Sequence, residues 1–179
     1  ENDYNWEELD KLSAHQKGKW TWPTAMMINF GLKGYKIVLQ EDWDFQSFVD
    51  HGEAFLIEKY GQDVAKEQIA NSDIFQERRL AKKFLKTGML KRKIPASDDI
   101  KKLLSDGYLV ICNVNSRLLN SQTGYEGHFV LLIGFDNSGF MLNDPYSPEF
   151  KNRHVTFCKF EQSWAYPTAD VKNIIAIKK

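Results

Sequence analysis

Two residues in the second half of the chain are of the types that carry out acid–base chemistry. His128 stands near the start of the stretch Gly-His-Phe-Val-Leu-Leu-Ile-Gly-Phe, and Asp144 ends the stretch Phe-Met-Leu-Asn-Asp. The polar residues 136–139 between the two stretches are typical of a β-hairpin turn. Pairing of the two strands is expected to bring His128 and Asp144 side by side.

A carboxylate beside a histidine fixes the tautomer of the ring and stabilises its charged form, which prepares it to act as the base for a nucleophile. A histidine at a strand end is also often satisfied by a neighbouring acid without any catalytic role. The spacing alone leaves both interpretations open. Arg117 and Tyr125 flank the loop that leads to His128. They are expected either to line a substrate cleft or to belong to an ordinary polar loop.

The candidate nucleophiles are weak. Cys112 follows Leu-Val-Ile, where a buried and inert thiol is usual, and Cys158 has no base close in sequence to lower its pKa. Both cysteines are therefore predicted to be structural. Thr21 needs a base to remove its proton before it can react.

No cofactor and no metal are predicted. The chain has no phosphate loop, dinucleotide fingerprint, HExxH or CxxC motif. His15, His51 and His154 have no ligand partners at metal spacing and are given no role.

The charge balance and the cysteine content limit the possible partners and location. The chain has 24 Lys plus Arg against 24 Asp plus Glu, so no net field draws it to nucleic acid or to an anionic membrane. The basic run at residues 91–93 is predicted to be a solvated turn. No apolar run reaches the roughly 20 residues of a membrane span, and no signal peptide is recognised. Two cysteines without a disulfide framework favour a reducing compartment, so a cytoplasmic location is expected.

The first half of the chain is predicted to be helical. Asn5 or Asp3 is expected to cap the first helix, and Gly34 to end the second. Asp42 or Asp44 is expected to cap one helix that runs to Gly61. The expected helices are residues 6–13, 24–33, 45–61, 63–71 and 73–86, with one strand at 35–40.

The second half is predicted to be mainly strands. After a helix at residues 97–105, the expected strands are 108–113, 127–135, 140–143, 155–157 and 173–177, with one helical turn at 160–164. Helices followed by strands, without regular alternation, indicate an α+β fold in which a helical N-terminal half packs on an antiparallel sheet. No repeat or linker divides residues 1–179, so a single domain is expected.

The chain resembles the C39-like cysteine peptidases of the papain-like superfamily. The resemblance is carried by Gly127-His128-Phe-Val, Gly134-Phe-Asp and Asn143-Asp144-Pro145, and by the helix and strand at residues 99–116. It extends to residues 160–164 and the final strand, although the helices at 45–86 are longer than the family minimum. It implies a papain-like fold in which His128 is the general base and Asp144 orients it.

The nucleophile of the family has no counterpart in this chain. The family carries its cysteine in a Cys-Gly-Pro motif at the start of a helix, a few residues after a glutamine. Residues 5–9 and 18–23 are similar instead to the second helix of the family and to the turn into its third. The cysteine-bearing helix is therefore expected upstream of residue 1, absent through truncation, processing or evolutionary loss.

The resemblance implies a hydrolase of peptide or amide bonds that has a base and an orienting acid but no nucleophile within this chain. Such a chain is expected to be inactive alone, with a peptide or protein as its partner. The alternative is a pseudoenzyme that binds a peptide in the former active-site cleft. A transferase or deamidase on the same scaffold is a third possibility, since fold does not fix function.

Overall fold

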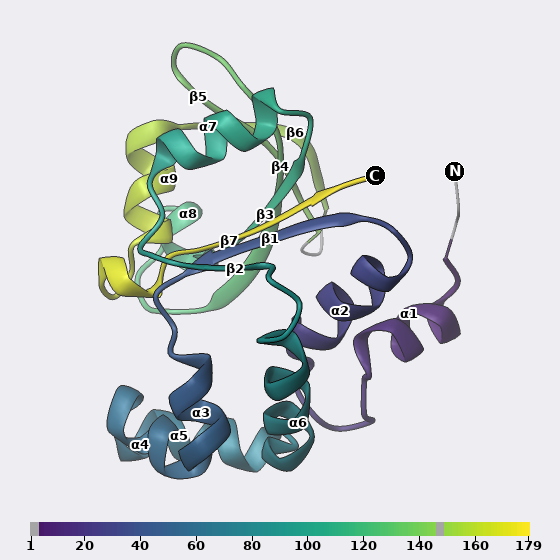
Figure 1. The fold of residues 1–179 in the computed structure, drawn as a ribbon. Coiled ribbons are helices and arrows are strands. Elements are labelled where there is room, and N and C mark those ends of the chain that lie inside the picture. The colour runs from purple at the N-terminus through teal and green to yellow at the C-terminus, as the bar shows by residue number, and fades with distance from the viewer. Residues whose placement is uncertain (1–3, 146–148) are drawn as a thin grey trace. The chain divides into compact units, whose positions relative to one another are not determined.

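The computed structural model describes residues 4–145 and 149–179. The chain forms two compact units, each assembled from two stretches of sequence. The helical unit comprises Glu1–Tyr35 and Asp44–Met89, and the sheet unit comprises Lys36–Trp43 and Leu90–Lys179. Figure 1 traces the chain through both units, from purple at the N-terminus to yellow at the C-terminus.

The helical unit contains the helices predicted for the first half of the chain. They are α1 (Trp6–Ser13), α2 (Thr24–Leu32), α3 (Phe45–His51), α4 (Glu53–Tyr60), α5 (Gln62–Asn71) and α6 (Ile74–Phe84). Asn5 caps α1 through a capping box with Glu8, and Asp44 and Asp73 cap α3 and α6 with their side chains. These caps confirm the predicted helix starts, while Asp3 lies outside the described residues.

The single helix predicted for residues 45–61 is wrong, because Gly52 divides it into α3 and α4. Gly52 has φ +56° and ψ −117°, a conformation that side chains other than glycine rarely adopt. A Cβ atom at this position would lie 2.9 Å from Cδ of Arg78. The guanidinium of Arg78 donates to the carbonyl of Val49 at 2.6 Å and so closes the end of α3.

Aromatic side chains form much of the core of the helical unit. Phe48 and Phe84 are fully buried, and the Trp22 ring stacks on Phe48 with centroids 5.4 Å apart. The Trp22 indole also donates to the hydroxyl of Ser72 at 3.0 Å. Trp22 therefore packs against this core, whereas Trp6 and Trp20 are exposed.

The sheet unit contains one seven-stranded sheet with the order β2-β1-β7-β3-β4-β5-β6. The strands are β1 (Lys36–Glu41), β2 (Leu90–Arg92), β3 (Leu109–Asn115), β4 (Gly127–Phe135), β5 (Gly139–Asp144), β6 (Phe150–Thr156) and β7 (Asn173–Lys178). The sheet is mixed, because β1 and β2 run parallel while every other neighbouring pair is antiparallel. The prediction of a wholly antiparallel sheet is thus wrong, because β2 runs parallel to β1. The sequence pattern did not predict this strand of three residues.

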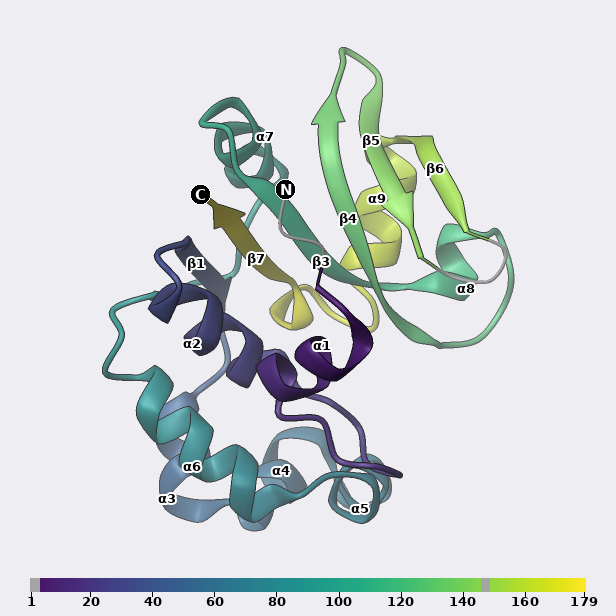
Figure 2. The ribbon, with the colours of Figure 1, turned by 90° about the vertical axis from the view of Figure 1, so that its right-hand side faces the viewer.

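Three helices cover one face of this sheet. They are α7 (Ser97–Ser105), α8 (Ser116–Leu119) and α9 (Phe157–Trp164). Their buried side chains, including Ile100, Leu119 and Phe160, belong to one cluster with Val130 and Leu142 of the strands. Figure 2 shows α8 and α9 beside the β4–β5–β6 hairpins. The α+β class is therefore confirmed, with the core of this unit between the helices and the sheet.

Some elements of the sheet unit differ from prediction. Strand β6 begins at Phe150 rather than at residue 155, and α9 begins at Phe157 rather than at residue 160. Helix α8 and the 3₁₀ turn η1 (Ala169–Val171) had not been predicted. In the part of the chain that the structure describes, no helix is both long and apolar enough to cross a membrane.

Candidate active site

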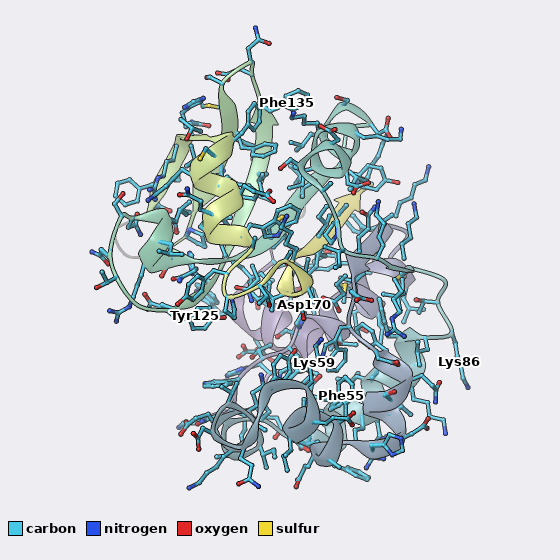
Figure 3. All side chains as sticks on the ribbon, turned by 90° about the vertical axis from the view of Figure 1, so that its left-hand side faces the viewer. Phe55, Lys59, Lys86, Tyr125, Phe135 and Asp170 are labelled. Atoms are coloured by element: carbon cyan, nitrogen blue, oxygen red, sulfur yellow. The ribbon has the colours of Figure 1, made fainter. Side chains whose placement is uncertain are left out.

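The predicted hairpin is formed by β4 and β5. Leu131 pairs with Asn143 and Leu132 with Leu142, so Asp144 extends toward the beginning of β4, where His128 lies. Figure 3 labels Tyr125 and Phe135 near the two ends of β4. His128 lies at the Tyr125 end, and the turn after Phe135 lies at the other. The hairpin thus brings together two residues that are separated by 16 positions in sequence.

The Nε2 atom of His128 lies 2.7 Å from Oδ1 of Asp144. The Asp144 side chain is 2% exposed and the His128 side chain 16% exposed, so the pair lies at the border of the buried face. His128 continues the row of Val130 and Leu132, because alternate side chains of a strand point to the same side. The predicted proximity of the two residues is confirmed, while their catalytic roles remain a prediction.

The second oxygen of Asp144 faces a cation that the sequence analysis missed. Nη1 of Arg153, on β6, lies 3.5 Å from Oδ2 of Asp144. Arg153 also donates to the side chain of Asn120 at 2.8 Å and to the carbonyl of Leu119 at 3.0 Å. No sequence pattern indicated Arg153, because the predicted strand began at residue 155, two residues after it.

Asn115 organises the loop between β3 and β4. Its buried side chain accepts from the backbone amides of Arg117 and Glu126, at 3.1 and 3.2 Å, and donates to the carbonyl of Gly124 at 2.9 Å. The amide of Ser116 donates to the carbonyl of Glu126 at 2.8 Å. These bonds fix the approach of the chain to His128. The available signal was an asparagine shortly after a predicted strand, a residue type whose side chain often bonds to the backbone of a turn.

Arg117 and Tyr125 both lie on this loop. The stem of Arg117 packs against Gly124, and a Cβ atom there would lie 3.2 Å from Cδ of Arg117. The Tyr125 ring stacks on Tyr166 with centroids 5.8 Å apart, and its hydroxyl lies 3.0 Å from where Gly127 would carry a Cβ atom. The Tyr125 hydroxyl is partly buried, which raises its pKa above the ordinary value, so it keeps its proton at neutral pH. A substrate-binding role for either residue stays a prediction.

The candidate nucleophiles lie in different settings. Cys112 is fully buried in the sheet core, and this burial raises the pKa of its thiol well above 9.0. Cys158 is exposed on α9, where its sulfur accepts from Gln162 at 3.6 Å. Thr21, in the helical unit, has its hydroxyl 2.7 Å from Nδ1 of His15. The core position predicted for Cys112 is confirmed.

The other histidine of the sheet unit belongs to the far end of the hairpin. Nε2 of His154 lies 3.1 Å from the hydroxyl of Ser138 and 3.3 Å from Asp136. Hydrogen bonds from Ser138 hold the pKa of Asp136 well below its usual range. Among the described residues, no group of three or more His, Cys, Asp or Glu side chains is arranged to hold a metal ion.

The fold and the His–Asp hairpin together agree with the papain-like class of α+β proteins. The family model described as "Peptidase_C39 like family" matches residues 54–169, which is more than half of the chain. The chain therefore belongs to the Peptidase_C39 like family. The match includes His128, Asp144 and Arg153. Comparison with curated proteins gave no match.

Proposed function

We propose that this chain carries the base and the orienting acid of a cysteine-peptidase-like hydrolase. The observation that carries the proposal is the 2.7 Å approach of Nε2 of His128 to Oδ1 of Asp144 in a member of the C39-like family. A carboxylate at Nε2 makes Nδ1 the ring atom that exchanges a proton with a nucleophile. The substrate class is a peptide or protein amide bond.

In this reaction a cysteine thiolate attacks the carbonyl carbon, and the imidazolium of His128 gives its proton to the leaving nitrogen as the C–N bond breaks. The resulting thioester is hydrolysed by a water molecule that His128 deprotonates. Asp144 holds the ring and stabilises its charge in both steps. The thiolate comes from outside residues 1–179, because Cys112 is buried with a raised pKa and the sulfur of the exposed Cys158 accepts from Gln162, which is not a base. The chain is therefore inactive alone.

A cytoplasmic location belongs to the same proposal. Cys112 and Cys158 are both free thiols, which a reducing compartment preserves.

The first test is the intact mass and N-terminal sequence of the protein isolated from its native cells. A cysteine upstream of Glu1, preceded by a glutamine, would support the hydrolase. In that full protein, His128→Ala should lower peptide hydrolysis by about 10²–10⁴-fold, the usual contribution of a general base. His154→Ala is the matched control, since His154 lies at the opposite end of the hairpin and should leave hydrolysis unchanged.

The same assay on residues 1–179 tests inactivity. No hydrolysis above background is expected from this chain. Turnover that His128→Ala abolishes would contradict the proposal. A native protein that begins at Glu1 would remove the source of the thiolate and reject the hydrolase in favour of the second candidate.

The second candidate is a pseudoenzyme that binds a peptide on the surface carrying His128. The stacked rings of Tyr125 and Tyr166 favour it, because they are 57% and 38% exposed and exposed aromatic rings are common peptide contacts. Binding of a fluorescent peptide library should weaken in Tyr125→Ala and survive in His128→Ala. A hydrolase should lose its activity in His128→Ala, because it needs the base. A peptide-binding pseudoenzyme should keep its affinity in the same variant, so this substitution distinguishes the two functions.

A further inference from the structure

Asp144 is held from both sides by two different strands. Oδ1 faces Nε2 of His128 on β4 at 2.7 Å, and Oδ2 faces Nη1 of Arg153 on β6 at 3.5 Å. We propose that Arg153 is a positioning residue that holds the Asp144 carboxylate in the orientation that accepts a hydrogen bond from Nε2–H of His128. This inference rests on the proposed function, in which Asp144 orients the base.

The guanidinium of Arg153 also has partners other than Asp144. Nη1 donates to Oδ1 of Asn120 at 2.8 Å, and Nη2 donates to the carbonyl of Leu119 at 3.0 Å. The ring of Phe150 lies 5.7 Å from the guanidinium carbon. The rigid fork of donors of an arginine allows one side chain to satisfy these partners together. The guanidinium therefore joins β5, β6 and the end of α8 at one point.

The sheet register accounts for this position. Arg153 pairs with Leu142 on β5, and an irregularity follows before Asp144 pairs with Phe150. This irregularity lets the Arg153 side chain, which is 23% exposed, approach a carboxylate that is 2% exposed. β-Bulges commonly redirect side chains in this way.

The physical need for such a residue follows from the burial of Asp144. The torsion that turns a carboxylate is soft, so a contact on each oxygen restricts its tilt more than a contact on Oδ1 does by itself. A buried carboxylate is also costly unless it is paired and hydrogen-bonded. An arginine at Oδ2 supplies the pairing charge and leaves Oδ1 directed at the imidazole.

A second positive charge on β6 pairs with another residue and provides a control. Lys151, on the same strand as Arg153, lies 3.1 Å from Glu149 and is 70% exposed. Lys151→Gln removes the same charge from β6 without touching Asp144. It therefore separates the contact made by Arg153 from a general change of charge.

The test is the nitrogen-15 NMR spectrum of the His128 ring in residues 1–179, recorded at a pH at which the imidazole is neutral and carries one proton. The unsubstituted chain should show a single tautomer with the proton on Nε2. Arg153→Met should give a mixture of tautomers and loss of the slowly exchanging Nε2–H signal. Arg153→Lys should restore this signal only in part, because one ammonium cannot serve Asp144 and Leu119 together.

Lys151→Gln should match the unsubstituted spectrum. An unchanged His128 signal in Arg153→Met, with shifts confined to Leu119 and Asn120, would show a structural clamp and overturn the proposal. Should Arg153→Met fail to fold, unchanged signals in both Arg153→Lys and Asn120→Ala would overturn it equally. Asp144→Asn distinguishes a failure of the inference about Arg153 from a failure of the proposed function. An unchanged Nε2 tautomer there would reject the His128–Asp144 pairing, and with it the proposed function.

Discussion

Glu77, on α6 of the helical unit, is 5% exposed, and its Oε2 atom has no hydrogen-bond partner among the residues that the structure describes. Burial, with a smaller contribution from the charge of Asp73, raises the pKa of Glu77 from 4.5 to about 7. The folded state therefore holds the proton more tightly than the unfolded state does. Stability should fall as the pH rises from about 4.5 to about 7, by about 3 kcal/mol.

Glu77→Gln should remove this dependence. Urea unfolding should show the variant more stable than the unsubstituted chain at pH 8, by about 3 kcal/mol, because glutamine carries no buried charge. At pH 4.5 the difference should be small. Glu58→Gln, at an exposed position on α4, is the control and should give no such trend. Equal stability of the chain and Glu77→Gln at pH 8 would mean that Glu77 reaches a counter-charge or water.

The two thiols should differ in reactivity. Iodoacetamide at neutral pH should modify Cys158 in the native chain and leave Cys112 unmodified until the chain unfolds, because Cys112 is fully buried. Cys158→Ser should then show almost no reaction. Mass spectrometry of the modified peptides makes the measurement. Rapid modification of Cys112 that depends on His128 would identify a nucleophile inside this chain and contradict the proposed inactivity.

At the residue scale, spacing predicted the His128–Asp144 pair because a hairpin constrains both ends at once. Arg153 and Asn115 were not predicted. The contacts of Arg153 depend on the irregular pairing of β6, and the asparagine bonds to a loop whose path is not encoded in any periodic pattern. Local sequence therefore predicts site residues on regular strands, such as His128 and Asp144, better than the residues that hold them in place, such as Arg153 and Asn115.

Among the elements, the β5–β6 hairpin depends on a close approach at Gly139. A Cβ atom there would lie 2.1 Å from the carbonyl oxygen of Val155, whereas a Cβ atom at Gly134, on β4, would meet nothing within 4 Å. Gly139→Ala should lower the free energy of unfolding by about 2–3 kcal/mol, because the backbone of β6 must move. Gly134→Ala should cost less than about 1 kcal/mol.

Urea unfolding and hydrogen exchange of β6 amides measure this difference. Faster exchange across β6 in Gly139→Ala, with Arg153 on that strand, would agree with the close approach. Equal stability of the two variants would show that β6 shifts at no cost. The proposed positioning by Arg153 would then be expected to tolerate movement of the strand.

Helix boundaries were predicted well where a capping side chain fixes them, as at Asn5 and Asp73. The break at Gly52 was missed, because an apolar repeat continues across it and the glycine alone does not reveal a positive φ. Strand β2 was missed because its three residues, Leu90–Arg92, are mostly charged. Its pairing with β1 comes from the neighbouring strand and not from its own propensity.

At the scale of the molecule, the sheet unit is not a continuous piece of sequence. Strand β1 comes from residues 36–41 and pairs with β7 along six residues, from Lys36–Lys178 to Glu41–Asn173. A fragment of residues 90–179 would lack β1 and expose the edge of β7, including buried Ile174 and Ala176.

This fragment should be unfolded or aggregated at concentrations where residues 1–179 are folded. Adding residues 36–43 through a Gly/Ser linker should restore a cooperative melting transition, followed by circular dichroism. A cooperative transition of residues 90–179 alone would show that β1 is dispensable. A linked fragment that fails to fold would indicate that the sheet unit depends on the rest of the chain.

The sequence by itself determined the α+β class, most helix and strand positions, and the hairpin that joins His128 to Asp144. These depend on periodicity, capping and turn chemistry, which act over a few residues. The tertiary structure decided what local patterns cannot encode. It paired β1 with β2 and β7, placed Arg153 on the second oxygen of Asp144, and buried Glu77 away from water. Each of these requires contacts between distant residues, whose free energy appears only when the chain has folded.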